Sequence, residues 1–352
     1  MSFDSGSTTT TVDPHAQLPA LPIELMMQIF EVAASQSLTS AKSLSLVASW
    51  SRKLTLPYLF TTIVHRVGNV RILAMAGAGY QINKPRTRLP EHIGRVVRNL
   101  WTESVGVSSP TNGMDLFQTC PNIEHMALPS AALRALYMSC QVASKRTPVD
   151  LARPAFPSVL RHITLITHTM RYEWHFLAGL RTPDGNLFLH NIAYLHMLDM
   201  QISTYVPHEM LPNLTHLALP YLDLGGNIAH DLLRLPDGVL EHPSLQMLVL
   251  TIDEFKYLNN PWYHIDRYAA PAPGATRYIP PRDSFRRIVR HARQRDERIH
   301  VILHPNSSQK ALQEWKLAAD GGQSIWQKAV LARKDETYGT HLPTAYDSNP
   351  RT

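Results

Sequence analysis

A short phrase that recurs along the middle of the chain most constrains what this sequence can fold into. The phrase reads Pro, then Asn or Ser, an apolar residue, two variable residues, an apolar residue, one variable residue and Leu, and it fills residues 121–128, 212–219 and 243–250. Looser copies end at Leu165 and Met197. Apolar residues two apart point to one face of a strand, and the Pro with Asn or Ser sets the turn before it. Each copy therefore predicts one short strand.

The stretches between these strands have the residue spacing of helices. They cover residues 130–143, 172–180 and 228–235. Each strand–helix unit leaves an apolar face open and must stack on the next unit. The expected fold class is therefore α/β, with an irregular succession of strand–helix units. A plain α/β domain whose strands happen to share turn chemistry is the alternative.

The last third of the chain is expected to close this succession. Residues 299–303 predict a final strand, and residues 312–317 and 324–331 predict closing or capping helices. Residues 282–298 predict a helix with apolar residues on one side and six arginines on the other: Arg286, Arg287, Arg290, Arg293, Arg295 and Arg298. A packed face with a solvated face explains this pattern, and binding of nucleic acid or an acidic partner is the functional alternative.

Residues 18–60 differ from the rest of the chain, because they predict a short helical hairpin with more apolar surface than so few residues can bury. Pro22 suits the first turn of a helix, and Glu24 interacts favourably with the helix dipole there. Ser40 can cap a second helix, and the Leu56-Pro57 pair is expected to end it. A small apolar element of this kind is typical of a docking module. The first hairpin of an ordinary helical core is the alternative.

This segment resembles the F-box motif. The residues that carry the resemblance are Leu21-Pro22-Ile23-Glu24-Leu25, Ile29, Leu44-Ser45-Leu46-Val47 and Trp50-Ser51-Arg52. The chain departs from the motif at Ala48-Ser49, where a Cys and a basic residue are common, and in the Ser-rich connection 33–39. Residues 56–63 are similar to the segment that joins F-boxes to substrate domains in many fungal relatives.

The recurring phrase resembles intracellular leucine-rich repeats, in which Cys-Pro-Asn-Leu often opens a strand, as Cys120-Pro121-Asn122-Ile123 does here. The two resemblances imply a fungal-type F-box protein, with a short N-terminal helical F-box followed by an irregular leucine-rich-repeat-like solenoid. The expected parts are a disordered N-terminus over 1–17, an F-box-like helical domain over 18–60, a substrate domain over 61–333 and a loose tail over 334–352.

The resemblance further implies a function, that of a substrate-recognition adaptor in an SCF-type cullin ubiquitin ligase. The F-box would dock on a Skp-type adaptor, and through it on a cullin, and the repeats would bind a protein substrate. Such a chain is not an enzyme and uses no cofactor or metal. The residues implied in adaptor contact are Leu21, Pro22, Ile23, Leu25, Ile29, Leu44, Val47 and Trp50.

Composition and motif searches bound the other classes of function. The 352 residues contain no apolar run of transmembrane length and no secretory signal, and two cysteines fit a reducing compartment, so we expect a cytoplasmic or nuclear protein without a membrane. No phosphate-binding loop, dinucleotide fingerprint, Gly-x-Ser-x-Gly elbow or His-Glu-x-x-His motif occurs. A net charge of +6 is within ordinary variation. A repeat scaffold outside any ligase and a nucleic-acid-binding protein remain the alternatives.

Histidines and cysteines are the remaining candidates for chemistry. The chain has 18 histidines, and the pairs His162 with His168 or His190 with His196 could meet in space. Because no carboxylate or cysteine accompanies them, we expect them at variable positions of strands and turns. Cys120 lies in a turn that enters a strand and is expected to be a small buried residue, and Cys140 has no basic neighbour to lower its pKa.

Overall fold

The computed structural model describes residues 21–65, 89–103, 117, 119–144, 159–182, 185–222, 233–264, 278–304, 308–335 and 337–344. The chain divides into two compact units, residues 1–59 and 60–352, and we describe each by itself. The predictions for residues 1–17 and for the chain after residue 344 lie outside the described residues. No helix within the described residues is long and apolar enough to cross a bilayer.

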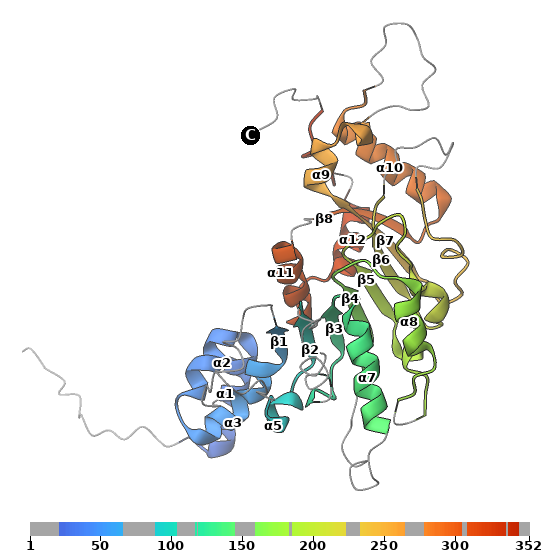
Figure 1. Ribbon diagram of the computed structural model, residues 1–352. Coiled ribbons are helices and arrows are strands. Elements are labelled where there is room, and N and C mark those ends of the chain that lie inside the picture. Colours follow the sequence, from blue (N-terminus) through green and yellow to red (C-terminus); the bar gives the residue numbers. More distant parts are fainter. Residues whose placement is uncertain are drawn as a thin grey trace, which may run out of the picture. The chain divides into compact units, whose positions relative to one another are not determined.

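We call the N-terminal unit the helical unit, and its described residues form three helices where the sequence predicted two. They are α1 (Ile23–Gln36), α2 (Leu38–Ser45) and α3 (Ser49–Phe60) (Figure 1). Pro22 is the N-cap of α1 and Glu24 lies in the first turn, close to the expectation.

The second predicted helix is broken in two, and its predicted cap was wrong. Ser37 caps α2, because its Oγ accepts a hydrogen bond from the backbone N–H of Ser40 at 3.0 Å. The break follows from Ser51, whose hydroxyl donates to the Leu44 carbonyl at 2.8 Å and accepts from the Ala48 N–H at 3.0 Å. The predicted stop before Pro57 was also wrong. Pro57 lies in the last turn of α3, so the helix loses one N–H donor and continues for only three residues.

The strands of the second unit, which we call the sheet unit, confirm the expected α/β class. The strands that the structure describes form one eight-stranded parallel sheet in sequential order. Their bounds are β1 (Thr62–His65), β2 (Asn99–Thr102), β3 (His125–Leu128), β4 (His162–Leu165), β5 (Tyr194–Met197), β6 (His216–Pro220), β7 (Met247–Asp253) and β8 (Ile299–His304).

Equivalent positions of the recurring phrase lie side by side in this sheet. Met126 pairs with Ile163, Ile163 with Leu195, Leu195 with Leu217, and Leu217 with Leu248. The phrase therefore sets both the strands and their register.

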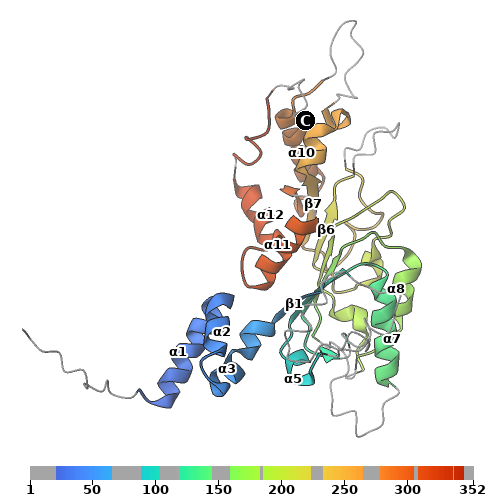
Figure 2. The same ribbon diagram turned by 60° about the vertical axis from the view of Figure 1, so that its left-hand side comes forward.

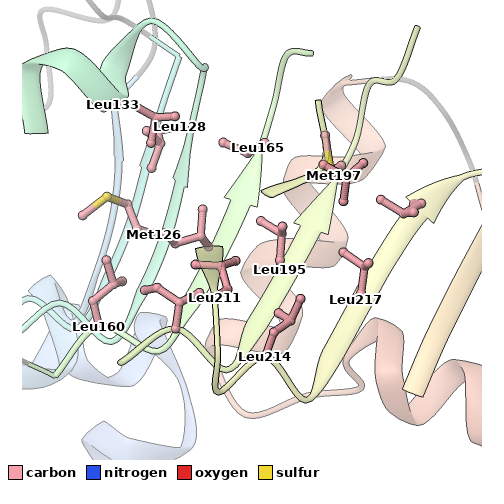
Figure 3. Packing of buried hydrophobic residues seen from close by; sticks show 14 of the residues in the cluster. Met126, Leu128, Leu133, Leu160, Leu165, Leu195, Met197, Leu211, Leu214 and Leu217 are labelled. Atoms are coloured by element: carbon pink, nitrogen blue, oxygen red, sulfur yellow. The ribbon is translucent and has the colours of Figure 1, made fainter. Parts of the chain in front are cut away.

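One face of the sheet carries the main core. Figure 3 shows leucine and methionine side chains of neighbouring strands packed in rows, among them Met126, Leu165 and Leu195. The longer described helices that contribute to this core are α7 (Ala132–Ser144), α8 (Arg171–Ala178) and α10 (Pro281–Arg295). Shorter elements complete the side: α5 (Glu91–Gly94), η2 (Phe188–Asn191), η3 (Pro207–Met210), α9 (Glu254–Asn259) and η4 (Pro261–His264).

The predicted helices on this side have mixed outcomes. Those over 130–143 and 172–180 are confirmed as α7 and α8. The one over 228–235 lies mostly outside the described residues, and the part that is described, residues 233–235, is not helical. The arginine-rich helix ends at Arg295 rather than at residue 298, because Asp296 has extended backbone and accepts hydrogen bonds from Arg298.

The closing helices, α11 (Ser308–Ala319) and α12 (Ile325–Lys334), cover the opposite face of the sheet (Figure 2). Ala311 and Leu312 of α11 pack with Trp101 and Ala127 of the sheet. Ala329 and Ala332 of α12 form a separate cluster on the same face with Ala218, Val249 and Ile302. Both faces of the sheet are therefore buried over much of their area, as is usual for parallel strands.

Candidate functional site

The helical unit exposes many large apolar side chains. Leu21 is 53% exposed, and Ile23, Leu25, Ile29, Val32 and Val47 are between 46% and 63% exposed. Among the described residues of this unit, the buried apolar side chains are those of Ala34 and Ala41. The unit therefore has alanine side chains inside and isoleucine and leucine side chains outside, which gives it an exposed apolar surface.

The predicted adaptor-contact residues fall into two groups in the structure. Leu21, Pro22, Ile23, Leu25, Ile29 and Val47 are exposed, whereas Leu44 and Trp50 are partly buried. Leu25, Ile29 and Val32 follow one another at spacings of four and three residues, so they share a face of α1. We call the exposed predicted residues the apolar surface: Leu21, Pro22, Ile23, Leu25, Ile29 and Val47.

Trp50 acts within the helical unit. Its ring stacks on Phe30 of α1 with centroids 5.1 Å apart and an interplanar angle of 24°. The contact joins α3 to α1, and the Ser51 hydrogen bonds join α3 to the end of α2. The partly buried residues of the predicted set thus hold the helices that present the exposed residues.

A row of stacked rings crosses the face of the sheet that α11 and α12 cover. The sequence did not predict this row as a site. His125 stacks on His162 with centroids 3.9 Å apart, His162 on Tyr194 at 4.0 Å, and Tyr194 on His216 at 4.5 Å. Each ring comes from the variable position before an inward-pointing residue of the phrase. Aligning the copies by their pairing register would have found the row, which we call the ring ladder.

A cavity of about 420 Å³ lies between the ring ladder and helices α11 and α12. Trp326 of α12 meets the His216 ring edge-on, with centroids 5.3 Å apart. At one side of the cavity, Glu314 of α11 binds His304 of β8 at 2.7 Å and Lys328 of α12 at 3.1 Å. The carboxylate therefore ties both closing helices to the sheet.

Burial keeps His162 and His196 of this face uncharged at neutral pH. Burial, with the nearby His125, His216 and Arg161, lowers the pKa of His162 to about 3. Burial also lowers the pKa of His196 to about 3, with a further lowering by His304. Burial alone would raise the pKa of Glu314, but its bonds to His304 and Lys328 outweigh this and lower the pKa to about 2. None of these three groups titrates near pH 7, which is unfavourable for general acid–base chemistry there.

Metal-binding groups, the two cysteines and the predicted histidine pairs are the other candidates for chemistry. Among the described residues, no group of three His, Cys, Asp or Glu side chains could hold a metal ion. Cys120 is buried, as expected, and burial raises its pKa to about 12. The side chain of Cys140 lies outside the described part of the structure. His162 contacts His125 and Tyr194, and His168 lies 3.4 Å from Asp199.

The fold defines an α/β protein with a parallel sheet and a separate helical unit that exposes an apolar surface. No protein-family model and no curated protein sequence matches the chain.

Proposed function

We propose that this chain is a substrate receptor of an SCF-type cullin ubiquitin ligase. Its helical unit would dock on a Skp-type adaptor, and its sheet unit would bind a protein substrate. The observation that carries the proposal is a coincidence of two independent features. The residues with F-box-like identity and spacing are largely the same residues that the helical unit leaves exposed, including Leu21, Leu25 and Ile29.

The arrangement of the sheet supports the second half of the proposal. Eight parallel strands in sequential order, paired through equivalent positions of one phrase, are compatible with an irregular leucine-rich-repeat-like solenoid. Such a scaffold offers an extended surface for a protein partner. The chain itself would perform no chemistry, because its role is to raise the effective concentration of a substrate near a conjugating enzyme. A ligase of this kind would act in the cytoplasm or the nucleus.

The decisive test is co-expression of the full chain with a Skp-type adaptor, followed by size-exclusion chromatography. We expect a one-to-one complex. The Leu21→Ala/Pro22→Ala double variant should weaken adaptor binding at least about tenfold, because truncation of central interface residues costs about 2 kcal/mol or more. Leu331→Ala is the matched control, since Leu331 is 55% exposed but lies on α12.

The control should bind the adaptor like the unchanged chain, and both variants should keep the thermal unfolding temperature of the sheet unit. Full adaptor binding by the double variant would contradict the docking role of these residues. A folded chain that does not bind the adaptor would favour the alternative, a protein-interaction scaffold that works outside any ligase.

A further inference from the structure

Helices α10 and α12 and strand β8 border a second cavity, on the sheet unit and separate from the ring ladder. Its volume is about 490 Å³. Arg286, Arg290 and Arg293 line it from successive turns of α10, and Arg333 lines it from α12. Among the described residues that line this cavity, Asp335 is the one carboxylate. We call the cavity the arginine pocket.

Two of these arginines are held in place by the fold. Arg293 Nη2 donates to the Arg333 carbonyl at 3.0 Å. Arg333 donates to the Glu297 carbonyl, and its Nη1 lies 3.4 Å from His300 Nε2. His300 Nδ1 lies 3.3 Å from the Ala329 carbonyl, to which it can only donate, so Nε2 is the ring atom that faces the guanidinium as an acceptor. The backbone and one ring thus orient two guanidiniums at the pocket.

The other two arginines have their charge unmatched. Among the residues that the structure describes, neither the Arg286 nor the Arg290 side chain makes a hydrogen bond or an ion pair. They are four residues apart on α10, where like charges destabilise a helix. Both are exposed, so each guanidinium is available to a ligand. Converging cations with one carboxylate among them favour an anion in the pocket.

The wall of the pocket is apolar. Phe285 and Val289 of α10 and Tyr338 line it beside the arginines. The rings of Phe285 and Tyr338 have centroids 6.1 Å apart, and the Tyr338 hydroxyl accepts a hydrogen bond from the Leu303 N–H at 2.9 Å. The pocket therefore pairs a cationic side with an apolar side, as small-ligand sites commonly do.

We propose that the arginine pocket binds a small organic phosphate, a molecule with a phosphate or diphosphate group on an apolar or aromatic body. Guanidinium groups form paired, charge-assisted hydrogen bonds with phosphate oxygens, which gives direction as well as charge. The volume falls within the range of about 300–1,000 Å³ that is typical of small-molecule pockets. This inference does not rest on the proposed ligase function, because it concerns the sheet unit alone.

The first experiment is a calorimetric titration of the full chain with three probes: pyrophosphate, ADP and adenosine. The buffer has an ionic strength of about 0.15 M, so that weak surface attraction is screened. We expect one molecule of ADP or of pyrophosphate to bind per chain. Adenosine should bind at least about tenfold more weakly than ADP, because it lacks the phosphates. Failure of both phosphate probes to bind would overturn the proposal.

The second experiment assigns the site. Arg286→Gln/Arg290→Gln should weaken ADP binding about tenfold or more. The control, Arg134→Gln/Lys316→Gln, also removes two positive charges, from exposed positions on α7 and α11. It should change the affinity for ADP less than about twofold. Equal weakening by the two pairs would mean a general charge effect and would overturn the proposal.

A third variant keeps the test valid if the double variant does not fold. Arg290→Lys retains the charge but loses the planar pair of donors, so a weakening of a few fold is expected from geometry alone. Unchanged affinity of this variant would overturn the role of Arg290. A phosphorylated peptide or a single-stranded RNA that binds through Arg286 and Arg290 at least about tenfold more tightly than ADP would also overturn the proposal, because the ligand would then be a macromolecule.

Discussion

The helical unit and the sheet unit differ in how far they bury their large apolar side chains. Leu25 of α1 is 46% exposed, whereas Leu195 of β5 is fully buried. Helices pack on each face of the sheet. Helices α11 and α12, which follow the last described strand, cover the second face. Three short helices have too little volume to bury their own side chains. The contrast teaches that exposure here reflects the size of the unit.

The largest effect on stability is expected in the sheet unit, from Leu195→Ala. Leu195 is fully buried within the main core, and removing a buried leucine costs about 3 kcal/mol through lost burial and the cavity left behind. Chemical denaturation of the sheet unit measures it. Leu331→Ala, at a position 55% exposed, should cost less than about 0.5 kcal/mol. Similar losses for both variants would break the contrast between buried and exposed leucines.

Acid is expected to destabilise the sheet unit next most strongly. The pKa of His162 and of His196 falls from 6.5 to about 3 on folding, so the unfolded chain takes up protons first as the pH drops. Stability is therefore level above about pH 7 and falls as the pH goes from 6.5 towards 3.

Each of these two histidines contributes a loss of about 1.4 kcal/mol per pH unit in that window, or about 3 kcal/mol for both at pH 5.5. Denaturation curves at pH 7.5 and 5.5 test this, and His162→Phe should reduce the loss between them by about 1.4 kcal/mol while keeping a ring in the ladder. A flat profile between these pH values would contradict burial of the histidines. Glu314 adds nothing here, because its pKa falls from 4.5 to about 2 and its contribution is lost only in that lower range.

A smaller effect is expected where the closing helices are tied to the sheet. Glu314→Gln removes the charge that binds His304 and Lys328, and a partly exposed ion pair of this kind contributes about 1 kcal/mol. Chemical denaturation at pH 7.5 measures the loss. The control is Glu241→Gln, which neutralises an exposed carboxylate outside α11 and α12 and should change stability by less than about 0.5 kcal/mol. If the two variants match, the link between α11, α12 and β8 is not electrostatic.

The smallest effect on stability is expected at Ile29 of the helical unit. Ile29→Ala should change the unfolding free energy by less than about 0.5 kcal/mol, because the side chain is 53% exposed. The reverse change, Ala41→Leu, forces a larger side chain into a fully buried position and should cost about 1–3 kcal/mol. Helical circular dichroism on melting reports both. A larger loss from Ile29→Ala than from Ala41→Leu would invert the comparison between the inside and the outside of this unit.

Local patterns predicted the strands and most of the longer helices well, and the breaks between the helices of the helical unit poorly. Strand ends at Leu128, Leu165 and Met197 follow from apolar spacing and turn residues that are close in sequence, and the structure confirms them. The break between α2 and α3 depends on the single Ser51 side chain reaching the Leu44 carbonyl, which no periodicity encodes.

The candidate sites also differ in whether local sequence could predict them. The residues of the apolar surface could be chosen from the sequence, because the resemblance is local and linear. The ring ladder could be found only by aligning the copies of the phrase with one another. The arginine pocket could not be found, because it joins residues that are far apart in the chain and share no pattern. His125 and His216 belong to one ladder, and Arg286 and Arg333 to one pocket. Only the sheet register and the return of α12 bring them together.

The position of α11 and α12 in the chain has a consequence for synthesis on the ribosome. The eight strands that the structure describes leave the ribosome before helices α11 and α12, which cover the second sheet face. Asn99 Nδ2 donates to the Ala319 carbonyl at 3.2 Å, a contact that must wait for more than two hundred further residues. Until then a growing sheet would hold Trp101, Ala127 and Val249 uncovered. Such a nascent chain is prone to aggregate, so we expect its productive folding to depend on chaperones that shield this face until translation ends.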